Sequence, residues 1–146
     1  MARAFAVEDG NLNTKSIITS RTVVNSDIDL TFAKKVSGDV FKKSDAAAVK
    51  QAVKNLLLTN YNEKPFRPLF GGDLNRFLFE LSDEFDELEI QDRVSAAISN
   101  YEPRAIVRKV IARIDPDNYN VNITVRFQVV NTLEEVELNV SLTRLR

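Results

Sequence analysis

The sequence predicts an α+β fold, in which about three helices pack on one face of a three- to four-stranded antiparallel sheet. Apolar residues recur at helical spacing between Ser44 and Tyr101, whereas they alternate strictly with polar residues after position 120. Between these two regions, Pro103 has no N–H and disfavours helical geometry at Glu102, so the last helix should end there.

The composition is that of a globular domain and excludes several kinds of chemistry. The chain has 146 residues, 44% of them hydrophobic, and a net charge of −1, which gives no field that attracts nucleic acid. Cysteine and histidine are absent, which excludes disulfides, thiol nucleophiles, His/Cys zinc sites and a Ser-His-Asp triad. We find neither a membrane span nor a signal peptide, and expect residence in the cytoplasm at synthesis.

The N-terminal region divides into an arm and the start of the domain. Residues 1–26 show little periodicity and predict a partly irregular arm, followed by a single domain over 27–146. Asp27–Phe32 alternates and predicts a short strand, a candidate fourth strand of the main sheet. Its apolar side chains should share one face: Ile28, Leu30 and Phe32. A lysine-rich loop follows.

The first predicted helix runs from Ser44 to about Thr59. Ser44 is a favourable N-cap, and Asp45 lies in the first turn, where the helix dipole favours a carboxylate. Lys50 and Lys54 should face water. The apolar stripe that should face the core consists of Ala46, Val49, Val53, Leu56 and Leu57.

Two further helices follow a proline-containing loop over residues 60–72. The loop's apolar residues should fold back over the core: Phe66, Leu69 and Phe70. Its Gly-Gly pair lacks the lysine and serine of a phosphate-binding loop, so we reject nucleotide binding. Asp73 should cap a short helix with the stripe Leu74, Phe77, Leu78 and Leu81. A third helix, from about Glu87 to Tyr101, should bury Ile90, Val94, Ala97, Ile98 and Tyr101.

Three strands complete the chain. Ala105–Ile114 has no clean apolar face, which is typical of a strand partly buried on both sides. Val121–Val129 and Val136–Leu142 alternate and predict a hairpin with one apolar and one polar face. The last strand should form an edge that can pair with a strand of another chain, unless a loop or the arm covers it. The residues assigned to this edge are Val136, Leu138, Val140 and Leu142.

Charged residues suggest surfaces for docking. Glu102 and Arg104 flank Pro103 and predict a rigid, charged corner between helix and sheet. The alternative interpretation is a helix stop with a local or solvated ion pair, and the tripeptide by itself favours this at least as strongly. Acidic residues dominate 73–92, and lysines dominate 34–43. Such patches are usually solvated, but they also suit oriented docking into an assembly.

Several motifs follow one another in a recognisable order. They are Lys54–Thr59, Glu63–Pro68, Phe70–Leu74, Leu78–Glu80 and Tyr101–Arg104, followed by the three strands. This series resembles the baseplate wedge family of contractile-tailed, T-even-like bacteriophages, the sheath-initiating family shared with the type VI secretion baseplate and often labelled lysozyme-like. The resemblance extends from about Asp27 to the C-terminus.

The resemblance implies a structural role in the tail baseplate of a virion, after assembly in the host cytoplasm. Glu102, Pro103 and Arg104 would dock on the helical core bundle of other wedge subunits, and Glu63 and Arg67 would also contact partners. The sheet would accept strands of the tail sheath protein and so template the first sheath ring. No catalytic residue, cofactor or metal is implied, and no nucleic acid, membrane or small-molecule partner.

Two alternatives belong to other functional classes. A peptidoglycan hydrolase needs two carboxylates across a cleft, one of them kept protonated as the general acid. Glu102 suits that role poorly, because the neighbouring Arg104 favours the charged carboxylate. The second alternative is a free regulatory adaptor of the same fold, which would act as a soluble pair with one partner, whereas a baseplate subunit should copurify with particles.

Overall fold

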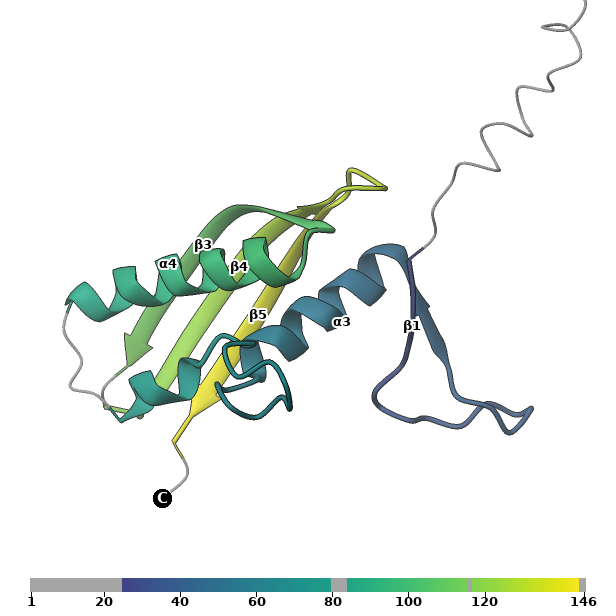
Figure 1. Cartoon of the computed structure of the whole chain (residues 1–146), viewed down its shortest axis with the longest axis horizontal. Coiled ribbons are helices and arrows are strands. Elements are labelled where there is room, and N and C mark those ends of the chain that lie inside the picture. Colours follow the sequence, from purple (N-terminus) through teal and green to yellow (C-terminus); the bar gives the residue numbers. More distant parts are fainter. Residues whose placement is uncertain (1–24, 80–83, 116, 145–146) are drawn as a thin grey trace, which may run out of the picture.

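The computed structural model describes residues 25–79, 84–115 and 117–144. In this part of the chain, a three-stranded antiparallel sheet of order β3-β4-β5 is covered on one face by helices (Figure 1). The predicted α+β class is therefore confirmed. The strands are β3 (Ala105–Asp115), β4 (Asn120–Val129) and β5 (Glu135–Thr143), and the helices are α3 (Asp45–Leu58), the 3-10 helix η1 (Leu74–Leu78) and α4 (Glu84–Tyr101).

The hydrophobic core fills the space between the sheet and the helices. β4 lies at the centre of the sheet, and its inward residues are all buried: Val121, Ile123, Val125, Phe127 and Val129. The predicted helix stripes meet them, with Val49 and Val53 from α3 and Val94 and Ile98 from α4 wholly inaccessible to solvent. Burial of each such side chain contributes about 1.5–3 kcal/mol, so this layer accounts for the stability of the fold.

A β-bulge explains why β3 lacks a clean apolar face. The pairing of β3 with β4 shifts between Val107 and Lys109, which leaves Arg108 as an extra residue. The bulge reverses the parity of the strand, so odd-numbered residues face the core before it and even-numbered residues after it. The sequence predicted a strand buried partly on both sides; on the outer face Ile111 is half-buried, but Ile106, Arg108 and Lys109 are exposed.

The strand predicted over residues 27–32 is shorter than expected and belongs to another sheet. In the part of the chain that the structure describes, β1 (Ser26–Ile28) pairs with β2 (Lys42–Ser44) alone, and β2 was not predicted from the sequence. The chain turns after β1, because the carboxylate of Asp29 accepts the N–H of Thr31 and its carbonyl accepts the N–H of Phe32. The apolar residues expected on a buried face are 48–67% exposed: Ile28, Leu30 and Phe32.

The helices agree with the prediction in order but differ in detail. α3 follows Ser44 as expected, although the Ser44 hydroxyl makes no capping hydrogen bond. α4 begins at Glu84, three residues before the predicted start. The second helix is a 3-10 helix, and Asp73 before it is left-handed (φ 49°) and does not cap it with its side chain.

Of the three residues in the loop over 60–72 that were predicted to contact the core, only Phe70 does so. Phe66 and Leu69 are exposed, at 101% and 67%, so the expectation that they fold over the core was wrong. Leu81 and most of the predicted arm lie outside the described residues, and the boundary between arm and domain stays a prediction.

Candidate functional site

The corner between α4 and β3 is a tight turn built around Pro103. The N–H of Glu102 donates to the carbonyl of Ile98 at 2.8 Å, which completes the helix, and the N–H of Ala105 donates to the carbonyl of Glu102 at 3.0 Å. Pro103 therefore occupies the second position of a β-turn, which its fixed φ favours. The predicted helix stop is confirmed, and the exposed proline ring stands at the outside of the turn.

Glu102 and Arg104 form a bidentate ion pair across this turn. Nε of Arg104 lies 2.5 Å from Oε1 of Glu102, and Nη2 lies 2.8 Å from Oε2. The carboxylate is buried, with Glu102 only 7% exposed, whereas the Arg104 side chain is 39% exposed. Hydrogen bonding to Glu102 raises the pKa of Arg104 above its ordinary value, and the charge of Asp27 acts in the same direction.

The ion pair changes what the corner offers to a partner. Both oxygens of Glu102 are engaged by the guanidinium, so its charge is not presented at the surface. Arg104 has five N–H donors, of which this pair uses two. The features available for contact are the ring of Pro103 and the remaining donors of Arg104. Glu102 holds the arginine in place.

The loop that carries Glu63 and Arg67 is shaped by hydrogen bonds of its own. The carboxylate of Glu63 accepts the backbone N–H of Asn60 at 2.9 Å and its side-chain amide at 2.7 Å, and these bonds hold the pKa of Glu63 below its ordinary value. The exposed side chain of Arg67 makes no hydrogen bond or ion pair with any described residue. Glu63 therefore shapes the loop, whereas the Arg67 side chain is exposed and is not paired with another described residue.

Tyr101 joins this loop to the corner. Its hydroxyl donates to the carbonyl of Leu69 at 2.9 Å, and its ring meets Phe70 edge-on at 5.1 Å between centroids. Because Tyr101 immediately precedes Glu102, the structure brings the two predicted docking elements onto one fixed support. The edge of the sheet is a separate element, formed by β5.

The two edges of the sheet differ. On β3, the N–H of Ile114 points away from β4 and is bound by the carboxylate of Glu87 from α4 at 3.0 Å. The N–H of Ala105 is bound within the turn, and the bulge at Arg108 lies between these points. Such devices prevent the addition of another strand. The β3 edge is therefore closed.

The β5 edge has no such cover within the described residues. The N–H of Arg144 bonds to the carbonyl of Tyr119 on the side of β4, and the register of β5 has no shift, so even-numbered residues face β4. The backbone groups of Glu137, Asn139 and Ser141 then point outward. The residues predicted for this edge direct their side chains to the core instead: Val136, Leu138, Val140 and Leu142.

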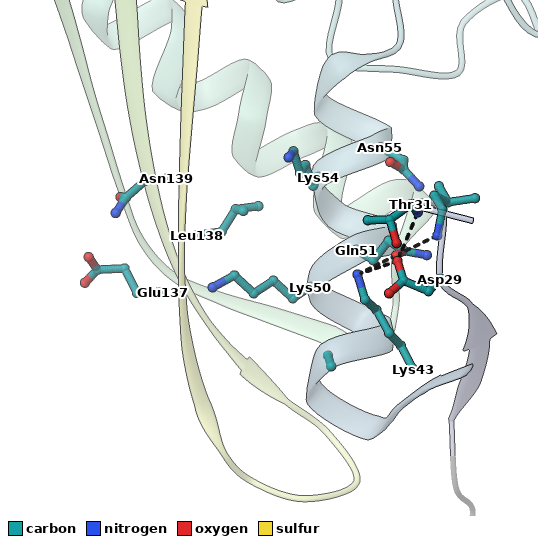
Figure 2. A pocket seen from close by; sticks show the side chains of 12 residues that line it. Asp29, Thr31, Lys43, Lys50, Gln51, Lys54, Asn55, Glu137, Leu138 and Asn139 are labelled. Carbon is teal, nitrogen blue, oxygen red and sulfur yellow. Dashed lines mark hydrogen bonds and ion pairs between the residues drawn. The ribbon is translucent and has the colours of Figure 1, made fainter. Parts of the chain in front are cut away.

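A groove of about 620 Å³ runs along this open edge, between β5, α3 and the loop after β1. Figure 2 shows Lys50 reaching from α3 toward β5, where Glu137 and Asn139 line the groove, and Lys54 on the same side of the helix. On the opposite wall, Gln51 is buried and donates to the carbonyl of Ile28 at 2.7 Å.

Residues 43–134 match the protein family described as Baseplate wedge protein gp25. This match covers more than half of the chain. The chain belongs to this baseplate wedge family. The resemblance inferred from the ordered motifs is therefore confirmed.

Individual relatives agree with the family assignment. The chain is similar to the Baseplate wedge protein gp25 of Enterobacteria phage T4, with 28% identity over 114 residues, or 77% of this chain and 85% of that protein. Among solved structures, a putative tail lysozyme from Geobacter sulfurreducens matches with a TM-score of 0.59 and 20% identity, covering 67% of this chain and 89% of its own. The anti-feeding prophage baseplate matches with a TM-score of 0.58 and 19% identity, over 82% and 86%. The two structural matches show a shared fold.

Sequence reasoning missed two features of this wedge protein. The outward backbone of Glu137, Asn139 and Ser141 could have been found only from the pairing parity of β5. Gln51 was also missed: it accepts a hydrogen bond from Nζ of Lys43 at 2.9 Å and fastens the β1–β2 hairpin to α3. A glutamine beside an apolar stripe carries no signal of that role.

The described residues contain neither a cluster of three acidic, cysteine or histidine side chains suited to a metal ion nor a helix long and apolar enough to cross a membrane.

Proposed function

We propose that this wedge protein is a structural subunit of the tail baseplate of a virion, which docks on other wedge subunits and accepts a strand of the tail sheath protein at β5. The first sheath ring is then templated on the baseplate. The observation that carries this proposal is the asymmetry of the sheet: the β3 edge is closed by Glu87, the bulge and the turn, whereas β5 is uncovered within the described residues. An unpaired edge suits β-strand addition.

The corner and the loop over residues 60–72 supply the second part of the proposal. Tyr101 joins the elements that carry the ring of Pro103, the half-exposed Arg104 and the exposed Arg67. Arginines held in a fixed geometry bind carboxylates and carbonyls of a partner at low entropic cost. These residues would contact the helical core bundle of the wedge.

Strand addition is tested by Asn139→Pro. Proline removes an N–H that points away from β4 and blocks an incoming strand, while the ladder to β4, which uses even-numbered residues, is kept. We expect particles that incorporate the variant but carry no sheath. Asn139→Ala is the matched control, because it keeps the N–H, and it should assemble normally. Sheath polymerisation on the proline variant would contradict the proposal.

Hydrolysis of peptidoglycan has less support. The name of the Geobacter sulfurreducens protein raises this activity, but both oxygens of Glu102 are engaged by Arg104 and are not available to protonate a leaving group. A turbidity assay on peptidoglycan tests this, with Glu102→Gln as the control. Clearing by the wild type that is lost in the variant would favour the enzyme.

A further inference from the structure

We infer that the groove along β5 selects an incoming strand that carries carboxylates at alternate positions, and that Lys50 and Lys54 bind these carboxylates. This inference rests on the proposed addition of a strand at β5. It goes further by naming the chemistry of the partner segment and the two residues that recognise it.

The charges in the groove are the first part of the argument. Five charged residues line it. Lys43 pairs with Asp29 at 3.1 Å, and Glu137 pairs with Arg126 at 2.7 Å on the outer face of the sheet. Lys50 and Lys54 make no hydrogen bond or ion pair with any described residue. Within the described part of the chain, the groove therefore carries two positive charges without an ion-pair partner, both from α3.

Their positions are the second part. Figure 2 shows α3 beside β5, with the Lys50 side chain extended across the groove toward the strand and Lys54 on the same side of the helix. Residues four apart on a helix are separated by about 6 Å along its axis. Side chains on one face of a strand recur every two residues, or about 6.6 Å. Two carboxylates at alternate positions of an added strand would therefore meet Lys50 and Lys54 in register.

The edge itself is the third part. Glu137 and Asn139 line the groove and also direct their backbone groups outward. A strand that hydrogen-bonds to these groups would lie beside β5 at the edge of the sheet, with the side chains of one face directed toward α3 and its lysines. Backbone pairing would supply affinity, and the two ammonium groups would supply specificity and register.

The test is an NMR titration of the full-length protein with two synthetic peptides. One has glutamates at alternate positions of a strand-forming sequence, and the other has glutamines at the same positions. We expect the acidic peptide to shift the amide signals of Glu137, Asn139 and Ser141 and to bind about tenfold more tightly, the effect of two surface ion pairs. The preference should decrease at high salt.

Two charge-matched variants locate the effect. Lys50→Gln with Lys54→Gln should remove the preference for the acidic peptide, and Lys34→Gln with Lys42→Gln, outside the groove, should leave it unchanged. Equal binding of both peptides would overturn the charge selection and leave strand addition standing. If neither peptide shifts the amide signals of β5, both the inference and strand addition would be overturned. The same holds if those amides are already protected from hydrogen exchange in the free protein.

Discussion

Replacement of Arg104 by alanine tests how the corner is held. The substitution removes two charge-assisted hydrogen bonds and leaves the carboxylate of Glu102, only 7% exposed, without them. A buried pair broken on one side costs about 3–5 kcal/mol, but the Arg104 side chain is 39% exposed, so solvent screening reduces this. We expect a loss of about 1–3 kcal/mol in the free energy of unfolding.

The assay is urea denaturation followed by circular dichroism. A loss of this size is smaller than the usual stability of a domain, so the variant should stay folded at 25 °C and still be absent from purified tails. Arg126→Ala is the control for stability, because it removes an exposed pair with Glu137 and should cost about 0.5 kcal/mol or less.

A double variant tests the same ion pair through the direction of its change in stability. Replacing both Glu102 and Arg104 by alanine leaves no buried charge unpaired, so the double variant should be more stable than Arg104→Ala alone. If Arg104→Ala were as stable as the wild type, or if the double variant were the least stable, the ion pair would not hold the corner. Global unfolding of Arg104→Ala would assign the motif a purely structural role.

Three further predictions concern other parts of the molecule. Gly71→Ala should lower stability by more than about 1 kcal/mol in urea denaturation, because its Cβ would overlap the carbonyl oxygen of Thr59. Gly38→Ala, also at positive φ, should cost less, because its Cβ would meet only the Lys34 side chain, at 3.8 Å. Asp29→Asn should flatten the loss of stability at acid pH: hydrogen bonds from a backbone N–H and a lysine lower the pKa of Asp29 below 3.8, so its contribution is present above that pH and lost as pH falls through the folded-state pKa. Gln51→Ala should speed amide exchange in β1 and β2 by about tenfold or more while leaving the exchange of β4 unchanged.

Local patterns in the sequence were sufficient to place most of the secondary structure. The stripe that includes Val49 and Val53, the alternation over Val121–Val129 and the missing N–H of Pro103 each act within a few residues. A helix or strand buries the side chains that its own period brings to one face, so such elements can be identified without knowing their neighbours.

Patterns failed where the outcome depended on partners far away in the chain. Asp27–Phe32 alternates like a strand, but the turn at Asp29 and the pairing of Ser26 with Ser44 limit it to three residues. Phe66 is apolar but remains in solvent, because Phe70 is the loop residue that reaches Tyr101. Composition cannot decide between two such residues, since packing against the rest of the fold selects one.

The sequence by itself determined the fold class, the helix stop at Pro103 and the family, because these depend on local periodicity and on ordered motifs. Only the tertiary structure decided that Glu102 is buried and that β3 is the closed edge of the sheet. It also decided that, among residues 25–79, 84–115 and 117–144, nothing covers β5 and nothing pairs with Lys50 or Lys54 in the groove beside it. Burial and pairing between segments depend on where the folded chain places their neighbours. No local pattern records that placement.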